Sequence, residues 1–480
     1  MDDSALLKAF SLGPQPELAA IVGGGGKSSL MFALARAWPG RTLITTTTRI
    51  FAAQMNLAPA VVQMGDEALE TEGEQWQALI SSLEASLDQF GRCLLVGPVG
   101  AGSNVEKALG VPSELPGQLL GQAGIDLVVV EADGSRMRPI KAPANHEPVV
   151  PPETTLLVPV AGIDALAGPV EAVAHRPERV RELLTAHDEW AAADGQSFIE
   201  EGRLTAVGIA RLLTHPQGGL KGAPEGARIV PLINKVETAV QFAAARQIAH
   251  LALREPRVEQ VVIGALRTPE PVRAVVRRVT AVILAAGSAS RMGRTKQLLP
   301  WGDTTVLGQV IRSARETAVS HVLVVSGHEA EAVEAIAQAE GAATLHNPRY
   351  AEGEMLSSLQ TAVRALPPNV GAVLVMLADQ PLVTPETIER LLQAYEQQGY
   401  GLIAPTYEGQ RGNPVLIDKR YFAALLALPV GAAPRHLLRR HPEDLLLLPV
   451  DSPGILIDLD DPQTYERWRM GNSKQQTGNN

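Results

Sequence analysis

The segment Leu284-Ala-Ala-Gly-Ser-Ala-Ser-Arg-Met-Gly-Arg-Thr-Lys-Gln-Leu-Leu-Pro300 follows an apolar run, Val279 to Leu284, which has the length and the bounding residues of a buried strand. After this run the chain turns through Ala285, Ala286 and Gly287 into a small, polar and cationic loop. Ligands of α/β proteins gather at the carboxyl ends of parallel strands, where such loops lie. The segment therefore predicts an α/β fold with a ligand site at this strand end.

The composition of this loop is suited to phosphate. Gly287 and Gly293 lack side chains, which lets a backbone approach a ligand closely or take positive φ. Free backbone N–H groups, Arg291 and Lys296 can bind phosphate oxygens, Lys296 as a compact charge and Arg291 as a fork onto two oxygens. An ordinary basic βα turn is the alternative interpretation, but the length of the pattern favours a phosphate site.

The pattern LAAGxSxRMGxxKxLLP resembles the nucleotide-binding signature of the nucleotidyltransferases that complete molybdenum cofactors, and among these the molybdenum cofactor cytidylyltransferases. The resemblance extends from about Val279 to Trp468 and continues in LADQP, GNPV and a terminal IDLDDP motif. It implies a Rossmann-like (GT-A-like) nucleotidyltransferase domain with a mainly parallel sheet. It also implies CTP as the nucleotide substrate, molybdopterin as the acceptor and Mg²⁺ as the metal.

Further along, strand and helix patterns alternate. Apolar strand runs at His321–Ser326 and Ala372–Leu377 are separated by helical stretches at Ala330–Ala339 and Leu356–Arg364. This alternation independently favours a mainly parallel sheet with helices on both faces.

The family resemblance assigns roles to individual residues. It implies that the catalytic residues are Arg291, Lys296 and Asp379. It implies that CTP contacts Leu284, Ala285, Ala286, Gly287, Gly293 and Ser357, that the pterin faces Gly412 and Asn413, and that the metal is held by Asp379 and Asp460. An acidic helix cap is the alternative interpretation of Asp460.

The composition of the 480-residue chain excludes several classes of function. A net charge of −10 without a basic block argues against nucleic-acid or anionic-membrane binding. The single cysteine, Cys93, excludes an intramolecular disulfide, and its apolar surroundings favour a buried thiol in a reducing compartment. No apolar run approaches the ~20 residues of a membrane helix, and no signal-peptide pattern is present. We expect a cytoplasmic protein.

The N-terminal half begins with a second strand, loop and helix pattern. The apolar run Leu18–Val22 precedes the glycines, and Leu30–Trp38 is helical in pattern. The loop between them consists of Gly23, Gly24, Gly25, Gly26, Lys27, Ser28 and Ser29. Successive N–H groups can cradle phosphate, Lys27 can neutralise it and Ser28 can ligate magnesium. Because Ile21 stands where the usual motif has its first glycine, we describe the loop as P-loop-like; a flexible glycine turn is the alternative.

Three further segments of this half carry polar groups at predicted strand ends. Thr42–Arg49 ends in four hydroxyls and a cation, which suits either an exposed edge strand or a nucleotide site. The strand run Ile125–Glu131 ends in Glu131 and Asp133, carboxylates of the kind that hold magnesium near phosphates. A strand at Ile229–Ile233 ends in the candidate nucleotide-binding residues Asn234 and Lys235, part of an NKxE sequence similar to the guanine-reading NKxD motif.

GGGGKSS, TTTTR, EADGSRxxPIKAPxxHEP and NKVE together resemble the YqeC family over about residues 4–268. That resemblance implies an accessory protein of selenium-dependent molybdenum hydroxylases, with an apo-hydroxylase as candidate partner. The residues of the loop suggest a nucleotide-dependent step, with ATP or GTP as candidate nucleotide. We therefore expect a YqeC-like domain at 1–268, a linker at 269–278, a MobA/MocA-like NTP transferase domain at 279–470 and a disordered tail at 471–480.

The expected reaction is transfer of CMP from CTP to molybdopterin with release of pyrophosphate. Two alternatives remain at this level. The C-terminal domain could be a sugar-phosphate-type nucleotidyltransferase, since that class shares the RMGxxK loop. The whole chain could instead be a nucleotide-gated carrier or metallochaperone that delivers the cofactor.

Overall fold

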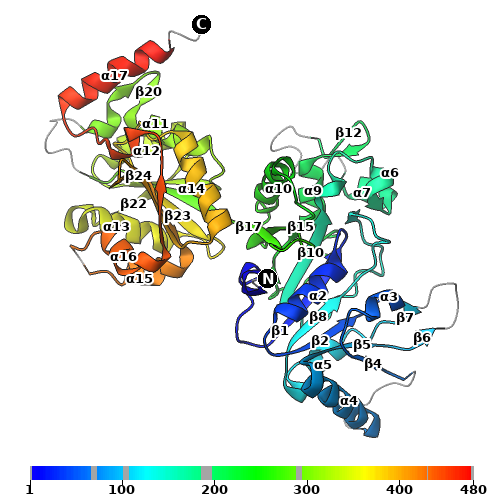
Figure 1. The fold of residues 1–480 in the computed structure, drawn as a ribbon. Coiled ribbons are helices and arrows are strands. Elements are labelled where there is room, and N and C mark those ends of the chain that lie inside the picture. Colours follow the sequence, from blue (N-terminus) through cyan, green and yellow to red (C-terminus); the bar gives the residue numbers. More distant parts are fainter. Residues whose placement is uncertain are drawn as a thin grey trace. The chain divides into compact units, whose positions relative to one another are not determined.

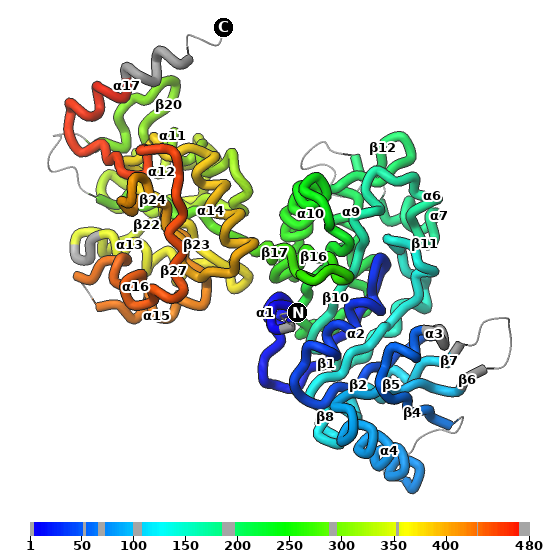
Figure 2. Tube along the Cα trace, in the orientation of Figure 1, coloured from blue at the N-terminus to red at the C-terminus, as the bar shows by residue number. Residues whose placement is uncertain are grey.

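The computed structural model describes residues 3–65, 73–100, 107–184, 197–287, 295–429 and 431–476. The chain divides into two compact units, Met1–Val276 and Arg277–Asn480. Figure 1 shows the elements of each unit, and Figure 2 follows the chain through them.

A ten-stranded sheet dominates the described part of the N-terminal unit, in the order β17-β16-β15-β10-β1-β8-β2-β5-β4 with β14 beside β10. Its central pairs, β1 with β8 and β10, are parallel. The strands are β1 (Glu17–Gly23), β2 (Arg41–Thr46), β4 (Val61–Gln63), β5 (Arg92–Val96), β8 (Ile125–Glu131), β10 (Leu156–Gly162), β14 (Arg228–Ile229), β15 (Leu232–Asn234), β16 (Gln260–Gly264) and β17 (Val272–Arg277).

Helices cover both faces of this sheet, which explains why its central strands read as continuous apolar runs. Along β1, Ala20 and Val22 pack toward α9 (Ala206–Thr214) and α10 (Ala239–Ala252). The alternate residues Ala19 and Ile21 pack toward α1 (Asp3–Ala9) and α2 (Lys27–Ala37). Helix α4 (Glu74–Phe90) covers the β2 and β5 region, where Cys93 is buried as expected. The unit is thus a three-layer α/β/α fold.

Two strands of this unit differ from expectation. The predicted strand Ile229–Ile233 is split into β14 and β15, because Pro231 has no N–H to donate to a sheet. The threonine-rich β2 lies inside the sheet between β8 and β5, with Thr42 and Thr45 fully buried, so it is not an exposed edge.

The segment at 269–278, expected as a linker, contains strand β17. Alternate residues of β17, Ala274 and Val276, belong to the core of the N-terminal unit. The arginines of this segment obscure the two-residue period in the sequence. Strand β18 (Val279–Leu284) of the C-terminal unit begins two residues after β17 ends.

An eight-stranded sheet forms the C-terminal unit within the described residues, in the order β22-β21-β18-β23-β26-β24-β25 with β27 beside β24. Strand β18 is parallel to both β21 and β23, as predicted, and β26 is antiparallel to β23. The other strands are β21 (His321–Ser326), β22 (Ala343–His346), β23 (Ala372–Leu377), β24 (Leu402–Tyr407), β25 (Gln410–Arg411), β26 (Val415–Asp418) and β27 (Leu445–Pro449).

Helices also cover both faces of the C-terminal sheet. One face packs against α11 (Val306–Arg315), α12 (Ala330–Ala339) and α14 (Pro385–Gln398), and the other against α13 (Tyr350–Ala365). The last helix, α17 (Pro462–Gln476), includes residues that were expected to be a disordered tail. No helix among the described residues combines the length and apolar character that a bilayer span requires.

The position of β17 in the N-terminal core yields a stability prediction. Val276 is 0% exposed, so Val276→Asp would bury a carboxylate without a partner. We expect it to lower the free energy of unfolding of the N-terminal unit by more than about 3 kcal/mol, measured by calorimetry on the full chain. The control is Val240→Asp, at an 81% exposed valine of α10. Equal stability of the two variants would contradict a core position for β17.

Candidate functional site

The charged centre of the C-terminal unit is Lys296, held between two carboxylates. Its ammonium donates to Asp379 and, over 2.6 Å, to Oδ1 of Asp460. Burial alone would lower the pKa of Lys296, but the two aspartates outweigh burial and raise it. The structure therefore brings together three of the residues predicted for this site, from segments as far apart as 164 positions.

Strand pairing explains how the loop and Asp379 meet. Leu284 at the end of β18 lies in register with Leu377 at the end of β23. Residues 285–287 and 378–379 therefore leave the sheet side by side, at the carboxyl ends of the parallel strands. Asp460 is brought to these strand ends by backbone pairing, since the Leu459 N–H donates to the Asp379 carbonyl over 3.1 Å.

The helix-cap alternative for Asp460 does not hold. The residue that caps α17 is Asp461, whose carboxylate accepts from the backbone N–H groups of Gln463 and Thr464, each over 2.9 Å. Asp460 is left to face Lys296. Adjacent aspartates in IDLDDP thus serve different purposes.

Sequence reasoning missed Asp458. Its carboxylate accepts from the Gln380 side-chain amide over 2.7 Å, and burial together with the nearby Asp379 raises its pKa. Asp458 and Asp460 are separated by one residue, a spacing that puts two side chains on the same side of extended chain. That spacing was the available signal.

A cavity of about 330 Å³ adjoins Lys296. Its walls are formed by Leu284, Ala285, Ala286, Gly287, Lys296, Gln297, Tyr350, Met355, Ser358, Leu377, Ala378 and Asp379. Ser358 lines it, whereas the predicted Ser357 does not. Both serine hydroxyls accept from the buried amide of Asn347 over 3.0 Å, which fixes the middle of α13 against the loop after β22.

The predicted acceptor-binding residues, Gly412 and Asn413, are not part of this cavity wall. Gly412 and Asn413 lie between β25 and β26, where the Asn413 N–H donates to the Ile455 carbonyl over 3.1 Å. They adjoin the segment that carries Asp458 and Asp460. Arg291 and Gly293 lie outside the described residues.

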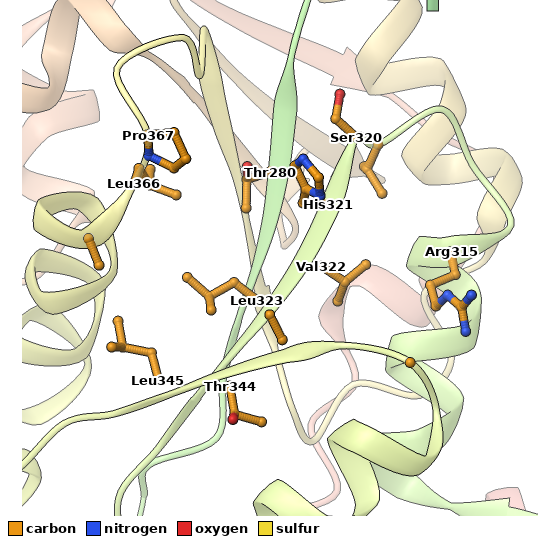
Figure 3. Close-up of a pocket in the computed structure, with 14 residues that line it drawn as sticks. Thr280, Arg315, Ser320, His321, Val322, Leu323, Thr344, Leu345, Leu366 and Pro367 are labelled. Atoms are coloured by element: carbon orange, nitrogen blue, oxygen red, sulfur yellow. The ribbon is translucent and has the colours of Figure 1, made fainter. Parts of the chain in front are cut away.

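A second cavity of this unit, of about 680 Å³, lies at the opposite edge of the sheet (Figure 3). Thr280 and His321 near the starts of β18 and β21 line it, with Arg315 on one side and Pro367 on the other. It shares no wall residue with the cavity beside Lys296. Because ligands of parallel sheets bind at the carboxyl ends of strands, the cavity beside Lys296 is the candidate ligand site of this unit.

The residues at Lys296 fit a divalent cation. Asp379 and Asp460 converge on one positive group, and carboxylate oxygens are the ligands that magnesium prefers. No group of three or more His, Cys, Asp or Glu side chains in the described part of the chain forms a complete metal site. A cation here would therefore complete its coordination with substrate oxygens or water.

In the N-terminal unit, the glycine loop is tightly bound to the rest of the protein. The N–H groups of Gly23, Gly24 and Gly25 donate to Asp133, the Val160 carbonyl and the Arg138 carbonyl. Gly25 has φ +78°, and a Cβ on it would lie 2.2 Å from the Gly162 nitrogen. These three N–H groups are therefore engaged by the protein itself. The first backbone N–H groups of α2 can still donate to a phosphate, because this helix begins at Lys27 and no side chain caps it.

Lys27 is part of a buried ionic network. Its ammonium lies 3.3 Å from Asp133 and 3.6 Å from Glu131 and donates to the Gly23 carbonyl. Burial would lower the pKa of Lys27, but the carboxylates raise it. Asp133 also pairs with Lys141, whereas Glu131 accepts from the Ser28 hydroxyl over 2.7 Å.

The network continues to Glu147, which pairs with Lys141 at 2.6 Å and with Arg176 at 2.9 Å. Burial alone would raise the pKa of Glu147, but hydrogen bonds from these two cations lower it to about 2. Asp133, Lys141 and Glu147 of the EADGSRxxPIKAPxxHEP motif thus lie in one chain of alternating charges between Lys27 and Arg176.

Asn234 and Lys235 lie beside the glycine loop. The Asn234 amide donates to the Gly25 carbonyl over 2.9 Å and accepts from the Leu266 N–H over 3.2 Å, so it joins two loops. Lys235 pairs with Asp164 at 2.7 Å.

These loops surround a cavity of about 870 Å³, within the range of small-molecule sites. Seven of the residues predicted for this site line the cavity: Gly25, Gly26, Lys27, Ser28, Glu131, Asn234 and Lys235. The other predicted residues, Gly23, Gly24 and Asp133, do not line it.

The C-terminal unit is a nucleotidyltransferase: residues 281–455 match the family described as MobA-like NTP transferase domain. Residues 19–178 match the YqeC protein family, so the chain joins these two kinds of domain.

Individual relatives are each similar to one part of the chain. The molybdenum cofactor cytidylyltransferase of Escherichia coli K12 is 28% identical over 185 residues, covering 38% of this chain and 92% of the relative. The uncharacterized protein YqeC of the same organism is 29% identical over 268 residues, covering 55% of this chain and 93% of the relative. A crystal structure of the Mycobacterium tuberculosis Rv0371c homologue from Mycobacterium sp. strain JC1 is 28% identical, with 42% of this chain and 100% of that chain covered and a TM-score of 0.37.

The low pKa of Glu147 predicts a pH dependence of stability. A carboxylate whose pKa is depressed in the folded state stabilises that state above its unfolded pKa, and loses this contribution as the pH falls through the folded value. We expect wild type to unfold at a higher temperature than Glu147→Gln near pH 6, and the difference to shrink between about pH 4.5 and pH 2. Thermal unfolding at several pH values measures this. A difference that stays constant across that window would contradict the ionic role of Glu147.

Proposed function

We propose that the C-terminal unit transfers CMP from CTP to molybdopterin, or to its molybdenum-loaded form, with release of pyrophosphate. The observation that carries this proposal is Lys296 held between Asp379 and Asp460 beside a cavity at the carboxyl edge of the sheet. The relationship to the Escherichia coli molybdenum cofactor cytidylyltransferase supports the choice of nucleotide and acceptor.

The chemistry requires placement and charge neutralisation more than a strong base. A phosphate oxygen of the acceptor attacks the α-phosphorus of CTP, the new P–O bond forms, and the bond to the β-phosphate oxygen breaks as pyrophosphate leaves. The acceptor oxygen is already anionic, so no proton needs to be removed from it. In-line placement and electrostatic stabilisation can therefore supply most of the rate enhancement.

The residues of this chain divide these tasks. Lys296 can neutralise the triphosphate, because its side chain is 24% exposed and lines the cavity. The turn at Leu284–Gly287 presents backbone groups in the cavity wall that can contact the base. Asp379 and Asp460 would hold Mg²⁺, which when bound neutralises charge on the phosphates. Arg291 remains a proposed contributor.

For the N-terminal unit we propose a nucleotide-binding accessory role in the maturation of selenium-dependent molybdenum hydroxylases, with ATP or GTP as ligand and an apo-hydroxylase as partner. The cavity at the start of α2 and the YqeC match support this role.

The test of transfer is a nucleotide-by-acceptor assay that follows pyrophosphate. Purified protein, Mg²⁺ and molybdopterin are mixed with CTP, GTP, ATP or UTP in turn. We expect pyrophosphate only with CTP and only when the pterin is present. Release with GTP but not CTP, or release that does not need the pterin, would overturn the assignment.

Two variants examine the residues. Lys296→Ala and Asp379→Asn should each lower the transfer rate by about 100-fold or more, since each removes charge stabilisation at the reacting phosphates. Their controls are Lys419→Ala and Asp451→Asn, at exposed positions of the same unit, which should transfer CMP at the wild-type rate. Wild-type activity in Lys296→Ala would show that the reaction takes place elsewhere.

A further inference from the structure

The N-terminal cavity carries an excess of positive charge. Its charged wall residues other than histidine are Lys27, Arg49, Arg136, Arg176, Lys235 and Arg267 on the cationic side and Glu131, Glu147 and Glu237 on the anionic side. Six cations thus face three carboxylates. Such an imbalance around a concave site favours an anionic ligand.

The protein itself compensates half of the cations. Lys27 is held by Asp133 and Glu131, Arg176 by Glu147, and Lys235 by Asp164. Lys27 is only 3% exposed, so its charge mainly balances its own carboxylates. The lysine that the sequence motif highlights is therefore not the main source of the excess charge.

The other three cations, Arg49, Arg136 and Arg267, form no ion pair with a carboxylate in the part of the chain that the structure describes, and all three are exposed. They come from three separate loops, after β2, β8 and β16 respectively. All three loops follow the carboxyl ends of strands in one sheet, where ligands of such sheets bind. Three guanidinium groups that meet no carboxylate among the described residues thus border one cavity.

The backbone at Arg136 supports a functional role for its loop. Arg136 and Met137 both have left-handed φ values, +49° and +62°, and Met137 is 87% exposed in the cavity wall. Residues other than glycine adopt this conformation at an energetic cost, and such strain concentrates at ligand sites. Burial, followed by the charges of Arg176 and Lys141, also lowers the pKa of the wall residue His175, which is consistent with a positive potential.

We propose that Arg49, Arg136 and Arg267 bind a linear polyphosphate chain in this cavity, with the first N–H groups of α2 as additional donors. Guanidinium groups fork onto phosphate oxygens, and three of them on separate loops match a chain of several phosphates better than a single small anion. The chain can belong to a nucleoside triphosphate or to an inorganic polyphosphate. This inference starts from the nucleotide-binding role proposed for the N-terminal unit; an inorganic chain as ligand would keep the arginine site and overturn that role. It is independent of CMP transfer.

The experiment is calorimetric titration of the full-length protein with ATP, GTP and inorganic tripolyphosphate. All proteins carry Lys296→Ala, so the C-terminal site is identical throughout and differences report on the N-terminal cavity. Arg136→Ala and Arg267→Ala should each weaken binding of the tightest ligand by about 10-fold or more, as expected for loss of a charge-assisted phosphate contact. The control is Arg36→Ala, at an exposed arginine in the last turn of α2.

Each outcome decides the proposal. Tighter binding of ATP or GTP than of tripolyphosphate, lost in the two variants, supports the proposal with a nucleoside triphosphate as ligand. Equal or tighter binding of tripolyphosphate, lost in the same variants, supports it with an inorganic chain. No binding of any probe, or equal affinities in Arg136→Ala, Arg267→Ala and Arg36→Ala, overturns it. Thermal unfolding confirms that the variants are folded. Absence of CMP transfer in the wild type would overturn only the C-terminal assignment.

Discussion

A lysine ammonium withdrawn from water needs carboxylates around it, because a buried charge without a partner costs several kcal/mol. Each unit of this chain is arranged around one such lysine. Lys27 follows β1 and meets Asp133, which follows the adjacent parallel strand β8. Lys296 is in the loop region after β18 and meets Asp379, which follows the adjacent parallel strand β23. The carboxyl ends of adjacent parallel strands lie side by side. In each unit the ion pair therefore joins the loop that carries the lysine to the end of the neighbouring strand.

The two lysines differ in whether their charge is accessible to a ligand. Lys27 is 3% exposed and belongs to a network that continues through Asp133, Lys141 and Glu147. That network holds the glycine loop in place. Lys296 is 24% exposed and lies in a cavity wall, where a triphosphate can compete with the aspartates for its charge. The same residue type thus stabilises structure in one unit and can serve chemistry in the other.

Local sequence predicted the strands well where both faces of a strand are buried. The apolar runs Ile125–Glu131 and Ala372–Leu377 are strands β8 and β23 with the predicted ends, because a strand covered on both faces needs apolar residues throughout. Prediction failed where the signal was short or mixed with charge. Strand β17 has only two buried residues and two arginines among its six, and Pro231 interrupts what looked like one strand.

The sequence by itself determined that the chain has two α/β units. It also determined the positions at which loops follow strands and the residue types in those loops. It also indicated that Lys296 lies in the loop after one strand and that Asp379 closely follows another. Only the tertiary structure decided which charges are paired within the protein and which face a cavity. Asp461 caps a helix while Asp460 meets Lys296. Lys27 is neutralised by carboxylates, while Arg136 meets none in the part of the chain that the structure describes. These differences depend on strand order and register, which long-range packing sets between segments more than a hundred residues apart.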